Sequence, residues 1–168
     1  MKFTQVMSKK IYKKLKKLAT EVSKFVVGFE GNISAKYNNK FLIKRSGAKL
    51  NGIKNKDFVL YDFNGNQLDN FFNKGSMEME FHKFLLSKKD INFVCHTHPN
   101  NCLKILCSDF CDDFATVRFF PDQVVFNDRV SCVVPYAKPG IELSNEITKS
   151  VTKFQKENKF FPKLILLK

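Results

Sequence analysis

Two histidines stand two residues apart in the segment FVCHTHP, and a glutamate stands upstream of them. The segment Asp90–His98 is predicted to be a strand. Side chains alternate between the faces of a strand, so His96 and His98 should point the same way. Two imidazoles on one strand face form a pair of metal ligands. A preceding helix, predicted over Ser76–Ser87, would bring the carboxylate of Glu78 towards the two histidines.

The helix predicted over Ser76–Ser87 has one apolar stripe and a polar start. Ser76 occupies the expected N-cap position. Glu78 and His82 fall four residues apart on another face. We expect His82 either to support a metal ligand or to have a structural role, rather than to bind the metal itself. The stripe is formed by Met77, Phe81, Phe84 and Leu85.

A different metal site is also compatible with these residues. His96 and His98 could join Cys102 and Cys107 in a structural zinc site, which would be closed and four-coordinate. The five cysteines lack the spacing of a disulfide framework, and we expect reduced thiols in a cytoplasmic protein. The N-terminus has no apolar segment of a secretory signal, and no apolar run is long enough to span a membrane.

The 168 residues carry a formal net charge of +13, which raises the question of nucleic-acid binding. Only Arg45, Arg118 and Arg129 of the 29 basic residues are arginines, and the lysines are spread over nearly every segment. Specific nucleic-acid surfaces favour arginine for bidentate contacts, so we expect no specific nucleic-acid partner. The charge would instead steer a phosphorylated small substrate towards the protein.

Hydrophobic periodicity and turn residues predict one mixed domain over residues 1–168, in which small-residue loops separate the strands. Gly31-Asn32 and Ser46-Gly47 lie in such loops, and loops of this kind suit phosphate binding. Helices are predicted over residues 7–25, 76–87, 101–107 and 141–158. Strands are predicted over residues 35–37, 41–44, 57–62, 90–98, 121–126, 130–136 and 163–167.

The order of these motifs resembles the class II aldolase/adducin family. Gly31-Asn32-Ile33-Ser34 is similar to its GN(I/V)S loop, and Ser46-Gly47 to its (S/T)G loop. Ser76-Met77-Glu78 with His82, and His96-Thr97-His98-Pro99, resemble its PS-x-E…H segment and its H-x-H strand. The later resemblance lies in Val134-Pro135-Tyr136, Pro139-Gly140 and Glu142-Leu143. The likeness extends over roughly residues 11 to 168, and motifs in register are more specific than any single one.

The resemblance implies an α/β fold of three layers, α/β/α, with a mostly antiparallel central sheet. It implies a zinc or other divalent ion held by His96 and His98, with Glu78 as the acid/base and a possible ligand in the resting state. It implies a phosphate pocket at Gly31, Asn32, Ser46, Gly47 and Ser76. A metal-dependent aldolase acting on a sugar phosphate, commonly as a homotetramer, is the expected activity. Met77 stands where some aldolases carry a second serine.

One feature departs from the family pattern. The family's third metal histidine follows a buried strand that resembles Leu164–Leu167 here, and the sequence ends at Lys168 without it. We therefore expect the domain to be incomplete at its C-terminus and weakly active by itself. The alternative is a non-catalytic, adducin-like domain. The sequence leaves open the sugar phosphate and the choice among aldolase, epimerase, dehydratase and decarboxylase.

Overall fold

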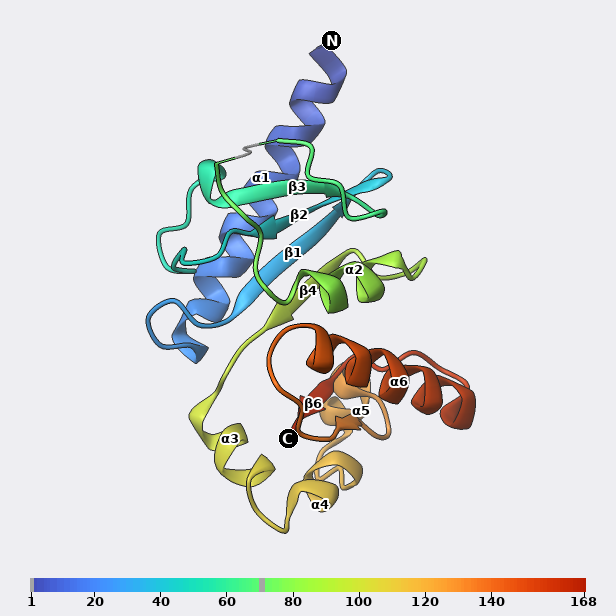
Figure 1. The fold of residues 1–168 in the computed structure, drawn as a ribbon. Helices are drawn as coiled ribbons and strands as arrows, with labels where there is room; N and C mark the ends of the chain where they lie inside the picture. Colours follow the sequence, from blue (N-terminus) through green and yellow to red (C-terminus); the bar gives the residue numbers. More distant parts are fainter. Residues whose placement is uncertain (1, 70–71) are drawn as a thin grey trace. The chain divides into compact units, whose positions relative to one another are not determined.

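The computed structural model describes residues 2–69 and 72–168, with side chains in the first helix from residue 9 onwards (Figure 1). The chain divides into two compact units, one up to Pro99 and one over Asn100–Lys168. Each unit is described by itself. No helix in the described residues is long and apolar enough to cross a bilayer.

The first unit is built around a four-stranded antiparallel sheet in the order β3-β2-β1-β4. Its helices α1 and α2 pack against this sheet (Figure 1). The elements are α1 (Lys2–Val22), the 3-10 turn η1 (Ser23–Phe25), β1 (Asn32–Tyr37), β2 (Lys40–Lys44), the 3-10 turn η2 (Asn55–Asp57), β3 (Phe58–Asp62), α2 (Met79–Ser87) and β4 (Phe93–His96).

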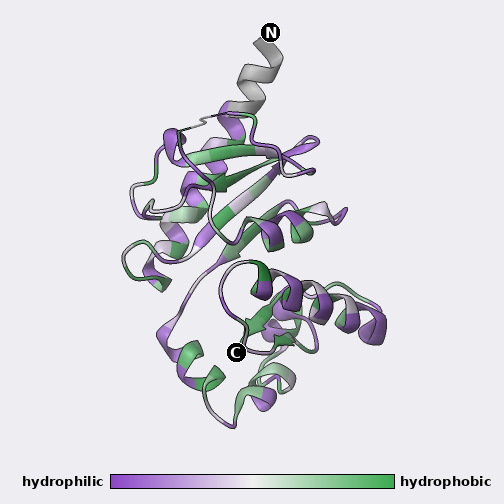
Figure 2. Ribbon diagram, in the orientation of Figure 1, coloured by the Kyte–Doolittle hydropathy of each residue, from purple (hydrophilic) through white to green (hydrophobic). Residues whose placement is uncertain are grey.

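Alternation along the strands gives this sheet two apolar faces. Ile33, Leu42 and Phe58 pack with Leu15 and Ala19 of α1. The next residues along the strands face the other way, where a second cluster includes Leu86 of α2; its strand members are Phe41, Ile43, Val59 and Tyr61. Figure 2 shows the hydrophobic character of these strands. Helix, sheet and helix thus form three layers, and the predicted α/β/α arrangement with antiparallel strands is confirmed.

Two boundaries near the histidines differ from the prediction. β4 ends at His96, so His98 lies beyond the strand. The backbone N–H of His98 donates to the carbonyl of Phe25 at 2.9 Å, outside the sheet. α2 begins at Met79, and Glu78 rather than Ser76 is its N-cap residue. Ser76 instead stabilises the preceding turn, because its Oγ and carbonyl accept from the backbone N–H groups of Glu78 and Met79.

Met77 was also misassigned to the apolar stripe of this helix. It precedes the helix, and 70 % of its surface is exposed. Phe81 and Leu85 are buried as predicted. The stripe therefore begins one turn later than the sequence periodicity indicates.

The second unit pairs β5 and β6 in parallel, with α6 packed on β5. A long connection is needed between parallel strands, and α6 provides it. The helix predicted over residues 141–158 is confirmed. The strands predicted over residues 130–136 and 163–167 are present but shorter, at 132–134 and 165–167. The elements are α3 (Asn100–Leu106), α4 (Cys111–Thr116), α5 (Pro121–Asn127), β5 (Cys132–Val134), α6 (Ile141–Asn158) and β6 (Ile165–Leu167).

The strand predicted over residues 121–126 is wrong, because this segment forms α5. Pro121 at the first helical turn has the backbone φ that a helix start requires. The side-chain oxygen of Gln123 accepts from the N–H groups of Phe119 and Phe120, at 2.6 and 3.2 Å. These two contacts start a helix despite the β-branched residues in its sequence.

A buried polar contact joins α2 to the sheet. His82 is fully buried, and its Nδ1 lies 2.7 Å from Oγ of Ser34 on β1. The pKa of His82 is lowered to about 3. Burial is the largest cause, the charge of His96 adds to the lowering, and the charge of Glu78 opposes it. The ring is therefore neutral in the folded protein, and His82 acts as a core residue between α2 and β1.

This buried ring should make the stability of the protein depend on pH. An unfolded histidine has a pKa near 6.5, so between about pH 3 and pH 6.5 the unfolded chain binds one more proton than the folded chain at this residue. The free energy of unfolding should therefore fall as pH drops through this window, by up to about 1.4 kcal/mol per pH unit. In His82→Gln the slope should be smaller, as urea unfolding between pH 4 and 7 can measure. An unchanged slope would show that His82 is not the titrating group.

Candidate functional site

The pairing of β1 with β4 sets the position of the site. Asn32, the first residue of β1, lies opposite His96, the last residue of β4. Residues directly opposite on antiparallel strands point to the same face, here the face covered by α2. The N-terminal end of α2 supplies Glu78 on that face. Three residues far apart in sequence are thereby brought together by the sheet register and one helix.

The carboxylate of Glu78 is held by two side chains. The amide Nδ2 of Asn32 donates to Oε2 of Glu78 at 2.5 Å, and Nδ1 of His96 lies 2.8 Å from the same oxygen. Asn32 also donates to Oγ of Ser76 at 3.2 Å. Glu78 is mostly buried, so the contacts fix its orientation.

Opposing effects set the protonation of Glu78. Its burial raises the pKa of the carboxyl group, whereas the hydrogen bond and charge of His96 and the hydrogen bond of Asn32 lower it. The lowering effects prevail, and the pKa lies below its usual range. Glu78 is therefore an oriented carboxylate at neutral pH, in the form that accepts a proton.

The two histidines of the predicted metal pair do converge, although only one lies on the strand. Nε2 of His98 is 3.2 Å from Nε2 of His96. Each ring has its other nitrogen against a carboxylate, since Nδ1 of His96 contacts Glu78 and Nδ1 of His98 lies 3.1 Å from Oε2 of Glu30. Metal-binding histidines typically hold their second nitrogen in this way.

The separation of the two Nε2 atoms suits a shared ion. Two nitrogens bound to one Zn²⁺ at about 2.0–2.1 Å, at a tetrahedral angle, lie about 3.4 Å apart. The observed 3.2 Å between His96 and His98 is close to that value, so the donor pair fits a divalent ion. Within residues 2–69 and 72–168, no three His, Cys, Asp or Glu side chains form a cluster that could hold an ion, and Cys102 and Cys107 join none.

The predicted phosphate residues are connected mainly through the backbone. The N–H of Ser46 donates to the carbonyl of Lys74, and the N–H of Ser76 donates to that of Lys44. The (S/T)G-like loop therefore runs beside the segment that leads into α2. Asn32 contacts Ser76 directly, but its amide donor is already engaged by Ser76 and Glu78, and its Oδ1 is buried without a partner. In this arrangement Asn32 orients Glu78.

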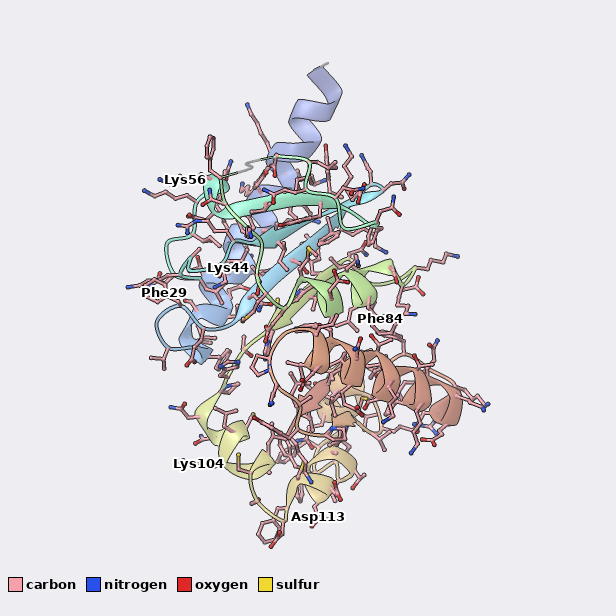
Figure 3. All side chains as sticks on the ribbon, viewed as in Figure 1. Phe29, Lys44, Lys56, Phe84, Lys104 and Asp113 are labelled. Carbon is pink, nitrogen blue, oxygen red and sulfur yellow. The ribbon has the colours of Figure 1, made fainter. Side chains whose placement is uncertain are left out.

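Lys44 and Glu30 contribute to this region, and the sequence analysis assigned neither. Lys44 is buried, and its Nζ donates to the carbonyl oxygens of Phe29 and Ala48 at 2.9 and 2.7 Å (Figure 3). It thereby joins the loop before β1 to the loop after β2. Burial lowers the pKa of Lys44 to about 8, with Glu78 opposing and Arg45 adding to the shift. The only sequence feature that could have pointed to Lys44 is its position at the end of an apolar strand.

Residues 12–163 match the sequence model of the class II aldolase and adducin N-terminal domain. The chain belongs to this family. An L-fuculose phosphate aldolase of Methanococcus maripaludis is 35 % identical over 129 residues, which are 76 % of this chain and 68 % of that protein. One from Methanocaldococcus jannaschii is 28 % identical over 127 residues, 75 % of this chain and 66 % of that protein.

Solved structures show the same fold. An L-fuculose-1-phosphate aldolase from Thermus thermophilus superposes with a TM-score of 0.71 at 16 % identity, over 94 % of this chain and 74 % of that one. A sugar-phosphate aldolase from Thermotoga maritima gives a TM-score of 0.72 at 16 % identity, over 87 % and 79 %. The chain thus spans about two thirds to four fifths of the length of these four proteins. The predicted family and fold class are confirmed.

The conformation of Gly31 yields a test of the site's backbone. Its φ is +65°, and a Cβ there would lie 2.7 Å from the carbonyl oxygen of His96. Gly28 has a similar φ of +59° but open space around it. Gly28→Ala should cost about 1–2 kcal/mol of unfolding free energy from the left-handed conformation alone. Gly31→Ala should cost at least about 1 kcal/mol more, because the clash adds to the same strain. Urea unfolding of both variants measures the difference, and equal losses would contradict the predicted close approach.

Proposed function

We propose that this domain is a metal-dependent, aldolase-type lyase that cleaves a sugar phosphate by a retro-aldol reaction. The observation that supports it best is the joint placement of an oriented carboxylate and two converging imidazoles, Glu78 with His96 and His98. Family membership supports the reaction class, and the names of the relatives support a sugar-phosphate substrate. The sugar itself and a cytoplasmic location stay predictions.

In this proposal the two histidines hold the ion through their Nε2 atoms. When bound, a zinc or other divalent ion supplies a Lewis acid that stabilises the negative charge developing on the substrate's carbonyl oxygen. Glu78 would take up the proton of the hydroxyl group next to the carbon–carbon bond that breaks. That hydroxyl becomes the carbonyl of the released aldehyde, and Glu78 would return the proton to the carbon that keeps the electron pair of the broken bond. Its low pKa keeps it ionised before the reaction, and Asn32 keeps it oriented. The carboxylate contacts Nδ1 of His96 here, so acid/base work suits it better than ligation.

The phosphate group of the substrate is proposed to bind at the loops that meet beside α2. Gly31 and Gly47 are small residues at which an anion can approach the backbone closely. The backbone N–H groups of Ser46 and Ser76 are engaged by carbonyl oxygens, so these two residues would offer their hydroxyl groups to the phosphate. The buried ammonium group of Lys44 joins two of these loops and adds positive charge. Asn32, whose donors are engaged, would serve this pocket by holding Ser76.

The proposal predicts a large kinetic effect of one uncharged substitution. Glu78→Gln should lower kcat for cleavage of a ketose phosphate by about 10²–10⁴-fold, because the proton acceptor is lost. The control is Glu80→Gln, which removes an equal charge from a half-exposed residue paired with Lys83. A retro-aldol assay over a panel of ketose phosphates, with added Zn²⁺, Co²⁺ or Mn²⁺, provides the measurement. Equal activity of the two variants would refute the role of Glu78.

A second candidate is a non-catalytic, adducin-like domain. It is favoured by the histidine count, since the whole sequence holds three and one of them is the buried core residue His82. A catalytic zinc usually has three protein ligands. This candidate predicts no turnover with any ketose phosphate even when the metal is bound. Activity that a chelator removes and added metal restores would exclude it.

We also propose that the protein forms homo-oligomers. In the second unit, several exposed apolar side chains lie in α5 and beside α4 and α5, and we refer to them as its apolar surface. The same segment, 109–128, carries five aspartates and one arginine in a chain of net charge +13. This acidic and apolar segment is complementary to a second copy of the chain, which offers apolar surface of its own and is basic elsewhere. The surface residues are Phe110, Phe119, Phe120, Val125 and Phe126, each at least 63 % exposed.

This surface gives a prediction about mass in solution. Wild-type protein should elute as an oligomer in size-exclusion chromatography with light scattering. The double variant Phe119→Ser and Phe126→Ser should shift it towards the monomer, because it removes apolar surface without touching the core. The matched control is Phe29→Ser, at an exposed phenylalanine of the first unit. A monomeric wild type, or an equal shift in the control, would contradict the proposal.

A further inference from the structure

Glu30 lies in the loop that leads into β1 and contacts one histidine of the proposed metal pair. Its Oε2 is 3.1 Å from Nδ1 of His98. The two side chains are partly exposed, at 51 % for Glu30 and 32 % for His98. No motif points to this residue, because the similarity to the family's loop begins at Gly31.

The contact determines which nitrogen of His98 can bind an ion. A carboxylate only accepts hydrogen bonds, so Nδ1 of His98 must carry the hydrogen. In the neutral ring, the lone pair is then on Nε2, the atom that lies 3.2 Å from Nε2 of His96. His96 is arranged in the same way, with its Nδ1 against Glu78. With both rings in this form, the two Nε2 lone pairs lie close together and make a candidate site for a cation.

His98 needs such a contact more than His96 does. His96 is the last residue of β4 and its backbone is fixed by pairing with Asn32. His98 lies past the end of the strand and is held by the segment before β1. The carbonyl of Phe25 accepts from its backbone N–H at 2.9 Å, and Glu30 contacts its ring.

The loop that carries Glu30 is itself ordered by local contacts. The N–H of Glu30 donates to the carbonyl of Val27 at 3.1 Å, and the N–H of Val27 donates to Oε2 of Glu30 at 3.5 Å. Gly31 then turns the chain into β1 with a positive φ. These contacts keep the carboxylate beside His98.

We propose that Glu30 is a positioning residue of the metal site: it holds His98 as the Nδ1–H tautomer and thereby strengthens the binding of a divalent ion by His96 and His98. The proposal rests on the metal dependence proposed above. Partners of metal-binding histidines typically contribute about 10- to 100-fold in metal affinity. Glu30 is not a catalytic residue in this account, because it acts through the imidazole of His98.

Metal titration tests the proposal directly. Zn²⁺ and Co²⁺ are titrated into the full chain by calorimetry and by visible absorption of Co²⁺. Glu30→Ala should raise Kd about 10- to 100-fold. Glu30→Gln keeps an acceptor oxygen and should recover part of this loss. The control is Glu21→Ala, which removes the same charge at similar exposure from an α1 residue paired with Lys17. If both alanine variants bind like the wild type, the proposal is overturned while the metal site stands.

A second measurement needs no metal and separates this proposal from the proposed function. Long-range ¹⁵N–¹H spectra of the metal-free protein report the tautomer of each imidazole. His98 should be the Nδ1–H form in the wild type and in Glu21→Ala, and should shift towards the Nε2–H form in Glu30→Ala. An Nε2–H form in the wild type would overturn the role of Glu30. A wild type that holds the Nδ1–H form but binds neither ion would instead refute the proposed metal dependence.

Discussion

The register between β1 and β4 is the constraint on which the rest of the site depends. It places Asn32 opposite His96 and turns both side chains towards the face that α2 covers. A slip of one residue would move every side chain of β4 to the other face. Phe93, which packs with Ile33 and Ala35 of β1 against α1, would then face α2, so the hydrophobic core opposes the slip. The packing of apolar residues on one face thus fixes the polar residues on the other.

The polar groups around this register are arranged in a chain of contacts. Ser76 and Asn32 hold Glu78, Glu78 contacts His96, and His96 meets His98, which Glu30 contacts in turn. Buried Lys44 joins the two loops that flank this chain. Desolvation makes each buried polar group costly unless it has a partner, so loss of one member affects its neighbours. The fold supports the site through these contacts between loops and strand ends.

Much of the fold follows from local sequence patterns, and the exceptions have physical causes. The alternation of apolar residues in β1 to β3 and the apolar stripe of α6 could be predicted from the sequence. The reason is that the buried side chains of a strand or helix recur at a fixed spacing. The sequence predicts a strand over residues 121–126 because Val124, Val125 and Phe126 favour one, whereas Pro121 and Gln123 start a helix. The motifs predicted Glu78, His96 and His98 as candidate site residues, and the structure brings these three side chains together. They could not reveal Glu30 and Lys44, whose roles come from contacts across the fold and from no spacing in the sequence.

The end of β4 falls between the two histidines, and this has a consequence for the choice of ion. His96 is fixed by the ladder of the sheet, whereas His98 belongs to the chain beyond it. One donor atom is therefore rigid, and the other can adjust its position by small changes in a loop. In the proposed metal site, a pair of this kind would adapt to cations of different radius, from Zn²⁺ to Mn²⁺, and would not select one by a fixed cavity size. Relative affinity would then follow the intrinsic order of the ions for imidazole, and the supply of metal in the cell would decide which one is bound.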